Sequence, residues 1–152
     1  MEQTESVDDY AHAYAKYHDD LVRVVHLMVG SRAVAEELVH DAFERLNKNW
    51  ESVDRPAAWL RTVATNLARS HARRIRLARL LPVPLERTVG DHEIDEIWWR
   101  VRRLPTRQRI AVVLRYYEDL PIDEIAAVMC VSPTAVSSML HRALNTLRKE
   151  LQ

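Results

Sequence analysis

Apolar residues along this chain recur three or four positions apart, the spacing at which side chains share one face of an α-helix. The clearest run lies near the N-terminus, and its members are Tyr10, Tyr14, Tyr17, Leu21, Val24, Val25 and Met28. No alternating apolar and polar run of useful length competes with this pattern, and the chain has only two glycines. The sequence therefore predicts an all-α fold.

Local start and stop signals divide the first half of the chain into three helices. Gly30 follows the first apolar run, where helices often end in a left-handed residue. Ser31 is placed to cap a second helix that reaches about Asn49. Pro56 falls in the first turn of a third helix, which continues through several arginines to about Arg79.

The segment Leu81–Gly90 holds two prolines and a glycine without helical spacing, so we interpret it as a linker. A chain of 152 residues is long enough for two small helical domains. We therefore place a first domain at 1–80, the linker at 81–91 and a second domain at 92–152. The second domain begins with a short helix, and Thr106 is placed to cap the next one.

A helix-turn-helix is predicted from Asp123 to Leu147. Two helices cross closely when the residue at the crossing is small and the second helix starts abruptly, conditions that Ala126 and Ser132–Pro133 meet. The second helix of such a motif can enter the major groove of DNA. Its outward residues are predicted to be Thr134, Ala135, Ser137, Ser138, Met139 and His141, with phosphate contacts from Arg142 and the hydroxyls of Ser132–Ser138. The alternative is a helical hairpin inside an ordinary bundle.

Charge is segregated although the formal net charge is zero. Residues 1–60 hold twelve Asp or Glu against six Lys or Arg, whereas residues 61–80 hold six Arg and no acid. A second acid-free stretch, Ile97 to Tyr117, adds six more Arg. Local basic faces, more than net charge, determine contact with phosphates.

The third helix should carry one such face. Asn66, Arg69, Arg73 and Arg76 follow at steps of three, four and three, so they share one side, with Ser70, His71 and Arg74 beside them. A packed helix with an acid-free basic side can follow a phosphate backbone, and Asn can bond an unpaired base. The alternative is a charged face that only contacts solvent.

Other classes of protein find less support. The single Cys130 cannot form an internal disulfide, and we interpret it as a small buried turn residue in preference to a redox sensor. No signal peptide or membrane span is apparent, which predicts a cytoplasmic protein. The scattered histidines and the lack of a phosphate loop argue against an enzyme, a metal site or a cofactor.

Four stretches together resemble a known family. They are AEELVHDAF (Ala35–Phe43), RPAAWLRTVATNLARSHARR (Arg55–Arg74), LPTRQRIAVVLRYYEDLPIDEIA (Leu104–Ala126) and SPTAVSSMLHRALNTLRKEL (Ser132–Leu151). Over residues 10–150 the chain resembles a bacterial RNA polymerase sigma factor of the extracytoplasmic function group, with only region-two and region-four domains. The resemblance implies promoter recognition, with RNA polymerase core, promoter DNA and an anti-sigma factor as partners.

The resemblance also implies roles for particular residues. It places the polymerase beta-prime clamp on the outer side of the second helix, at Glu37, Leu38, His40 and Asp41. It places the minus-ten element on Asn66, Arg69, Ser70, Arg73, Arg74 and Arg76, with an unstacked base captured by the loop 47–55. The second domain would read the minus-thirty-five element as duplex, and its helices around 107–117 would dock on the polymerase flap.

The sequence departs from the family at the recognition helix. Cys130 occupies the turn where glycine is common and is expected to impose a right-handed or mildly strained turn. No Lys or Arg lies between Pro133 and Leu140, although such a side chain makes the commonest specific contact to guanine. A second hypothesis is therefore an interaction protein that keeps the sigma scaffold and binds polymerase or a regulator without selecting promoters.

Overall fold

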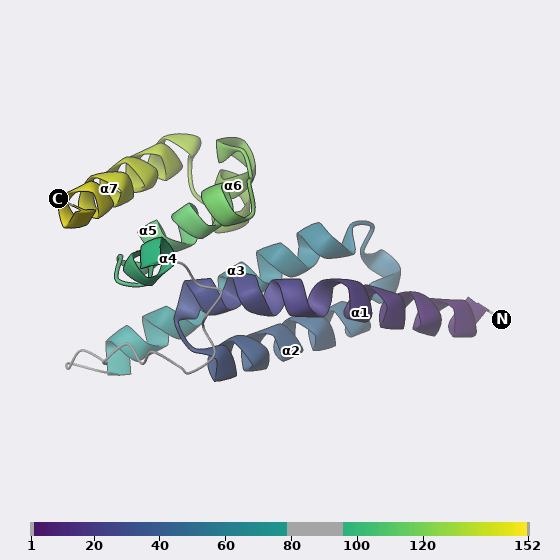
Figure 1. Cartoon of the computed structure of the whole chain (residues 1–152). Coiled ribbons are helices and arrows are strands. Elements are labelled where there is room, and N and C mark those ends of the chain that lie inside the picture. Colours follow the sequence, from purple (N-terminus) through teal and green to yellow (C-terminus); the bar gives the residue numbers. More distant parts are fainter. Residues whose placement is uncertain (1, 79–95, 152) are drawn as a thin grey trace.

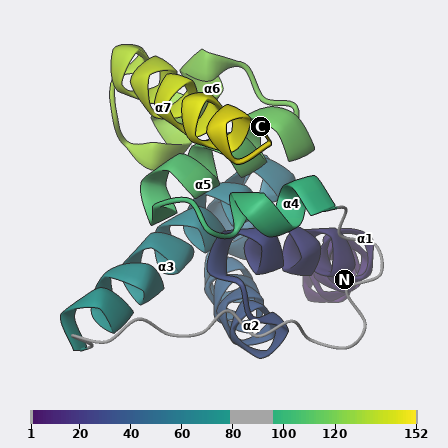
Figure 2. The ribbon, with the colours of Figure 1, turned by 60° about the vertical axis from the view of Figure 1, so that its left-hand side comes forward.

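The computed structural model describes residues 2–78 and 96–151, and the linker predicted at 81–91 lies outside them. The described residues form seven α-helices and no strand, which confirms the all-α prediction. Helices α1 to α3 form one bundle, and α4 to α7 lie together on one side of it (Figures 1 and 2).

The N-terminal bundle consists of three long helices. Helix α1 spans Glu2–Val29, α2 spans Arg32–Lys48 and α3 spans Pro56–Ala78, with a short 3-10 turn at Trp50–Ser52. All three are amphipathic, so their apolar sides meet in a shared core. The most deeply buried side chains of this core include Val25, Met28, Val39, Phe43, Leu46 and Leu60.

The predicted signals between α1 and α2 are confirmed. Gly30 has a φ of 80°, the left-handed geometry that ends a helix at low cost only when no Cβ is present. The Ser31 hydroxyl accepts a hydrogen bond from the Val34 backbone N–H at 3.3 Å, so it caps α2 as expected.

The C-terminal helices are shorter. Helix α4 spans Glu96–Val101, and α5 spans Thr106–Val112 and continues as a π-helical turn over Val113–Tyr117. Helix α6 spans Ile122–Met129 and α7 spans Pro133–Leu151. The predicted capping role of Thr106 is wrong. Pro105 occupies the cap position of α5, and Thr106 is already the first helical residue.

The two groups of helices share one core. Buried apolar side chains form a single cluster that runs from Leu21 in α1 to Leu147 in α7. Polar contacts join the groups at its edge. Arg61 Nε donates to Glu118 Oε2 at 3.1 Å, and the Arg102 guanidinium donates to the Gly30 carbonyl oxygen. The described residues therefore adopt a closed arrangement, in which α4–α7 pack against α1–α3.

Candidate nucleic-acid interface

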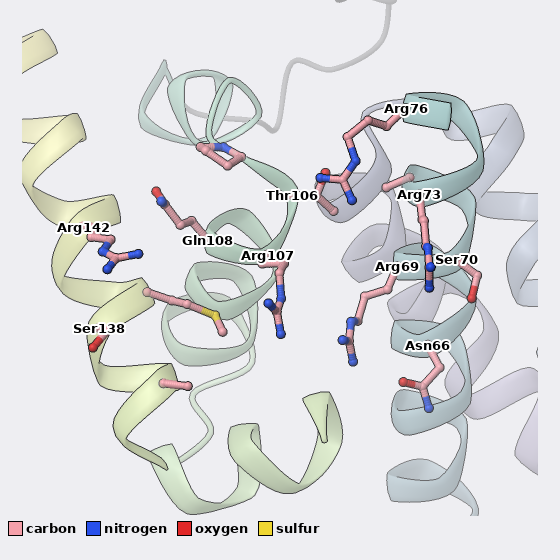
Figure 3. Close-up of a pocket in the computed structure, with 14 residues that line it drawn as sticks. Asn66, Arg69, Ser70, Arg73, Arg76, Thr106, Arg107, Gln108, Ser138 and Arg142 are labelled. Atoms are coloured by element: carbon pink, nitrogen blue, oxygen red, sulfur yellow. The ribbon is translucent and has the colours of Figure 1, made fainter. Parts of the chain in front are cut away.

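The predicted arginine face of α3 lines a cleft of about 1060 Å³. The helix can present this face because Leu60, Ala64, Leu67 and Ala68 turn the opposite side of α3 into the core. Figure 3 shows the arginine side chains extending from α3 toward α5. The α3 residues that line the cleft are Asn66, Arg69, Ser70, Ala72, Arg73 and Arg76.

The opposite wall of the cleft comes from the C-terminal helices. The turn before α5 and its first residues contribute Pro105, Thr106, Arg107 and Gln108, and α7 contributes Ala135, Ser138, Met139 and Arg142. The arginine face and part of the predicted recognition helix thus face each other across one space (Figure 3). The sequence missed Arg107 and Gln108 as members of this surface, because only the packing of α5 against α3 brings them there.

The cleft is strongly basic. Among the described residues that line it, five are arginines and none is an Asp or Glu. The structure records no hydrogen bond or ion pair between other described residues and the side chains of Arg73, Arg76, Arg107 and Arg142. Arg69 differs, because its guanidinium donates to the carbonyl oxygen of Met129 at the end of α6. The cleft can therefore attract an anion through four available guanidinium groups.

The helix-turn-helix forms from α6 and α7, as predicted from Asp123 to Leu147. The Ser132 hydroxyl accepts a hydrogen bond from the Ala135 backbone N–H at 3.1 Å, which confirms the predicted cap, and Pro133 is the first residue of α7. Val136 is fully buried and packs beneath the turn. The abrupt start of α7 thus follows from local sequence.

Cys130 confirms one prediction and corrects another. It has φ 56° and ψ 43°, a left-handed geometry that is mildly strained for a residue with a Cβ, so the strained alternative of the prediction applies and the right-handed one does not. Its side chain is exposed, so the interpretation as a buried turn residue is wrong. The left-handed geometry arises because Cys130 and Val131 donate backbone N–H groups to the last turn of α6.

The cleft divides the predicted recognition face in two. Ser138 and Arg142 line the cleft together with Ala135 and Met139. The side chains of Thr134, Ser137 and His141 are exposed and do not line it. Ser138 and Arg142 are also exposed but border the cleft, whereas the second group lies outside it.

His71 and Arg74 lie on α3 beside the arginine face, outside the cleft. Burial lowers the pKa of His71, the charge of Arg74 lowers it further, and the carboxylate of Glu37 opposes both. The lowered pKa favours the neutral form of His71. The positive charge on this side of α3 therefore comes from the arginines.

The second acid-free stretch does not form the basic face that its composition suggested. Arg102 is 1% exposed and lies 5.1 Å from the Trp99 ring centroid. Arg109 donates to the Arg102 carbonyl oxygen at 2.6 Å, and burial lowers the pKa of Arg109 to about 10, with a further contribution from Arg102. Arg100 pairs with Glu96 at 3.2 Å. These arginines are engaged by other parts of the fold and do not form a surface for phosphates.

The remaining arginines of that stretch differ in their surroundings. Arg115 donates to the Leu120 carbonyl oxygen at 3.1 Å. Arg103 and Arg107 are exposed, and only Arg107 lines the cleft. The composition of the stretch revealed its charge, whereas the burial of each side chain depends on contacts with distant residues.

The outer side of α2 carries most of the predicted polymerase-binding residues. Glu37 and His40 are exposed and Asp41 is partly exposed. His40 Nε2 lies 3.0 Å from Glu44, and Asp41 accepts from Arg45 Nε at 2.9 Å. Leu38 is only 7% exposed and belongs to the core, so it cannot lie on this outer surface as predicted.

The loop predicted to capture a base is short and ordered by local bonds. Asn49 Nδ2 donates to the Arg45 carbonyl oxygen at 2.8 Å, and the Ser52 hydroxyl donates to the Asn49 carbonyl oxygen at 2.9 Å. The Trp50 ring packs edge-on against Tyr10 at 5.7 Å between centroids. The loop is therefore tied to both α1 and α2.

Metal ligation and membrane insertion find no support in the parts of the chain that the structure describes. No group of His, Cys, Asp and Glu there could hold a metal ion. No single helix among those residues is long and apolar enough to cross a membrane. Helices α6 and α7 are long and apolar enough only when they are counted together, and the pair is bent by 103° at the turn between them.

Comparison with known proteins identifies the two groups of helices. The family model described as Sigma-70 region 2 matches residues 13–77, and the one described as Sigma-70, region 4 matches residues 94–147. The RNA polymerase sigma-E factor of Streptomyces coelicolor is 32% identical over 143 residues, which cover 88% of this chain and 80% of that protein.

Two further relatives carry the name of the extracytoplasmic function (ECF) group. The ECF RNA polymerase sigma factor SigW of Bacillus subtilis is 26% identical over 168 residues, covering 95% of this chain and 90% of that protein. The ECF RNA polymerase sigma factor BldN of S. coelicolor is 29% identical, and the match covers 98% of this chain but only 62% of that protein.

Solved structures share the arrangement of helices. The sigma factor RpoE in complex with the anti-sigma factor NepR, from Bartonella quintana, has a TM-score of 0.76 at 19% identity and covers 94% of this chain and 96% of that one. CnrH in complex with the cytosolic domain of CnrY has a TM-score of 0.64 at 22% identity, covering 93% and 86%. The all-α fold, the basic cleft and these matches together show that the chain belongs to the ECF group of RNA polymerase sigma factors, which direct RNA polymerase to promoters to initiate transcription.

Proposed function

We propose that the arginine face of α3 binds the minus-ten promoter element while it opens, and that the start of α7 contacts the minus-thirty-five element as duplex. The observation that supports this most is the exposed basic face of α3, where Arg73, Arg74 and Arg76 make no hydrogen bond or ion pair with another described residue. Asn66 lies on the same face of α3, and Arg74 lies beside that face outside the cleft. On the recognition helix, Thr134, Ser137 and His141 are exposed outside the cleft.

Opening of the minus-ten element costs a few kcal/mol for each unstacked base. Phosphate contacts from Arg73, Arg74 and Arg76, with hydrogen bonds from Asn66, would offset that cost once the strand is single. We place the displaced base near the Trp50–Ser52 turn. The protein supplies binding energy here and carries out no catalysis of its own.

Promoter binding requires the closed arrangement to open. Elements centred near minus ten and minus thirty-five are about 25 base pairs apart, which is about 85 Å of duplex at 3.4 Å per step. In the closed arrangement their proposed binding faces line a single cleft. The two helical groups must therefore separate before both contact DNA, as the proposed division into domains at 1–80 and 92–152 allows.

Polymerase is the partner that would hold the open form. The outer face of α2, with Glu37, His40 and Asp41, is the surface that we assign to the beta-prime clamp, and Leu38 supports it from the core. Its acidic character suits a basic partner helix. An anti-sigma factor is a further expected partner, because the structure of RpoE contains the anti-sigma factor NepR. The structure of CnrH likewise contains a partner, the cytosolic domain of CnrY. Because transcription takes place in the bacterial cytoplasm, we expect the protein to act there.

Run-off transcription with core polymerase tests the proposal. Arg74→Gln and Asn66→Ala should reduce promoter-dependent transcript by roughly tenfold each, because each removes a contact worth about 1–3 kcal/mol. Arg103→Gln, an exposed arginine outside the cleft, is the matched control and should retain full activity. Equal losses in Arg74→Gln and Arg103→Gln would show that general charge, and not the α3 face, supports binding.

One observation favours the alternative of an interaction protein that does not select promoters. The recognition helix carries no Lys or Arg between Pro133 and Leu140, and two of its DNA-facing candidates, Ser138 and Arg142, face the cleft. The same assay separates the hypotheses. Polymerase binding by the wild-type chain without promoter-dependent transcript would support the alternative.

A further inference from the structure

Four arginines from three helices converge on the cleft. Arg73 and Arg76 come from α3, Arg107 from α5 and Arg142 from α7, and no Asp or Glu of the described ranges 2–78 and 96–151 lines the space between them. The structure records no hydrogen bond or ion pair from these four side chains to any other described residue. Like charges that face a common space repel one another, and an anion placed between them relieves the repulsion.

This set of cations exists only in the closed arrangement. Arg73 and Arg76 belong to the N-terminal bundle, whereas Arg107 and Arg142 belong to the C-terminal helices, and packing between the groups brings them to one cleft (Figure 3). A promoter-bound molecule with separated helical groups would lack the site. An occupant of the whole cleft must therefore be a ligand of the closed form.

The chemistry of the cleft favours phosphate groups. Guanidinium groups bind phosphate oxygens through two parallel hydrogen bonds, which suits them to polyanions of this class. Thr106, Gln108 and Ser138 add neutral hydrogen-bonding groups along the same wall. The volume of about 1060 Å³ lies at the upper end of the range for small-molecule sites, so it admits a ligand of nucleotide size with several phosphates.

We propose that this cleft binds a multivalent phosphate anion, of the nucleoside polyphosphate or inorganic polyphosphate class, which bridges the two helical groups and holds the molecule closed. A ligand that binds only the closed form stabilises it by mass action, in proportion to the logarithm of its concentration over its Kd. The anion would thereby oppose promoter binding. That last consequence rests on the proposed function, whereas the binding site does not.

Isothermal titration with inorganic tripolyphosphate, at an ionic strength held constant with NaCl, tests the site on the full chain. We expect saturable binding of one anion per chain. Arg107→Gln and Arg142→Gln should each weaken it about tenfold, since each removes a charge-assisted contact. Their matched controls are Arg103→Gln in the turn before α5 and Arg148→Gln on α7, exposed arginines outside the cleft, which should stay within twofold of wild type.

Two measurements separate anion binding from a change in stability or shape. Thermal unfolding without anion should not fall below that of wild type in any of the four variants, because the substituted side chains are exposed and removal of a cleft arginine relieves repulsion between like charges. X-ray scattering should show a radius of gyration of about 15 Å at saturation, the value for a compact chain of this length. ATP in place of tripolyphosphate distinguishes a nucleotide from inorganic polyphosphate as the preferred source.

Several outcomes would overturn the proposal. Binding that is absent at millimolar tripolyphosphate is one, and equal weakening by the cleft variants and their controls is another, since it would indicate general screening. A ten-residue oligodeoxynucleotide that binds more tightly than tripolyphosphate, with the same dependence on Arg107, would make the cleft a nucleic-acid site. None of these assays contains polymerase or promoter, so their failure leaves the run-off result unaffected.

Discussion

Arg69, on the arginine face of α3, donates a hydrogen bond to the main-chain carbonyl oxygen of Met129, the last residue of α6. A guanidinium at a helix carboxyl end is electrostatically favourable, because the last carbonyl groups of a helix carry partial negative charge. The same side chain is among those proposed to contact the minus-ten element. One nitrogen of the Arg69 guanidinium is engaged by Met129 in the closed arrangement, so closure competes with the full set of DNA contacts that this side chain could make.

The ion pair between Arg61 and Glu118 offers a direct test of closure. Both side chains are mostly shielded from solvent, at 24% and 21% exposure, and the atoms lie 3.1 Å apart. Glu118→Ala should destabilise the closed arrangement by about 1 kcal/mol, at the upper end for partly exposed pairs. Small-angle scattering should detect this as a larger radius of gyration. The exchanged pair Arg61→Glu with Glu118→Arg should restore compactness, and a compact Glu118→Ala variant would contradict a closing role.

Removal of the α7 cap should weaken the helix-turn-helix. The Ser132 hydroxyl accepts the Ala135 N–H, and replacement of such a cap by Ala costs about 1 kcal/mol. For a chain of this size, Ser132→Ala should lower the melting temperature by about 2–4 °C. Ser137→Ala, an exposed serine on the same helix, is the control and should melt as wild type does. Equal melting of both variants would mean that the cap contributes little.

Cys130 should tolerate glycine better than other residues. Its left-handed geometry costs a residue with a Cβ about 1–2 kcal/mol, and glycine avoids this but loses about 0.5–1 kcal/mol of chain entropy. Cys130→Gly should therefore raise the free energy of unfolding by about 0.5 kcal/mol. Cys130→Val should lower it, because β-branched residues disfavour positive φ. Urea unfolding measures both, and a less stable glycine variant would show that the thiol contributes to packing.

A lysine at Ser137 should strengthen binding to duplex promoter DNA. The side chain is exposed on the outer part of the recognition face, in a helix start without positive charge. A new phosphate or guanine contact there should tighten binding roughly tenfold. Fluorescence anisotropy with a minus-thirty-five duplex measures the effect. Ala127→Lys, exposed on α6 outside the proposed DNA surface, controls for added charge. Equal tightening by both variants would argue against groove contact by α7.

Acidification should destabilise the protein partly through His71. Its pKa is lowered in the fold by burial first and by Arg74 second, so the unfolded chain binds a proton at a higher pH than the folded one does. The stability that neutral His71 contributes is present above its ordinary pKa of about 6.5 and is lost as the pH falls below that value. Urea unfolding between pH 7 and 5 should show a shallower decline for His71→Gln. If the free energy of unfolding falls equally with pH in the variant and the wild type, His71 does not contribute to the pH dependence of stability.

Features that depend on neighbours in sequence were predicted well. Ser31 and Ser132 cap their helices, and Pro56 and Pro133 begin theirs, because these bonds and backbone angles involve residues at most four positions away. The steps of three and four in α3 likewise fixed which arginines share a face. The family resemblance then supplied the functional interpretation, which the comparisons confirm.

Features that depend on distant contacts were not predicted. Nothing near Arg102 in sequence indicates that its guanidinium crosses to Gly30 in the other helical group. Leu38 was assigned to a surface although it completes the core, and Cys130 was assigned to the interior although it is exposed. In each case the exposure of the side chain depends on whether another helix covers it. The spacing of apolar residues along one helix does not predict that.

The acceptors at Met129 and Gly30 are main-chain carbonyl groups, which has a consequence for how this fold can diverge over evolutionary time. A main-chain oxygen persists through any side-chain replacement that leaves the helix end intact. Replacement of the Met129 side chain would thus leave its acceptor available, whereas replacement of Gly30 would strain the helix end that presents the other acceptor. In relatives, substitution of the donors Arg69 or Arg102 would remove these two contacts, just as substitution of Arg61 or Glu118 would remove the ion pair between the helical groups.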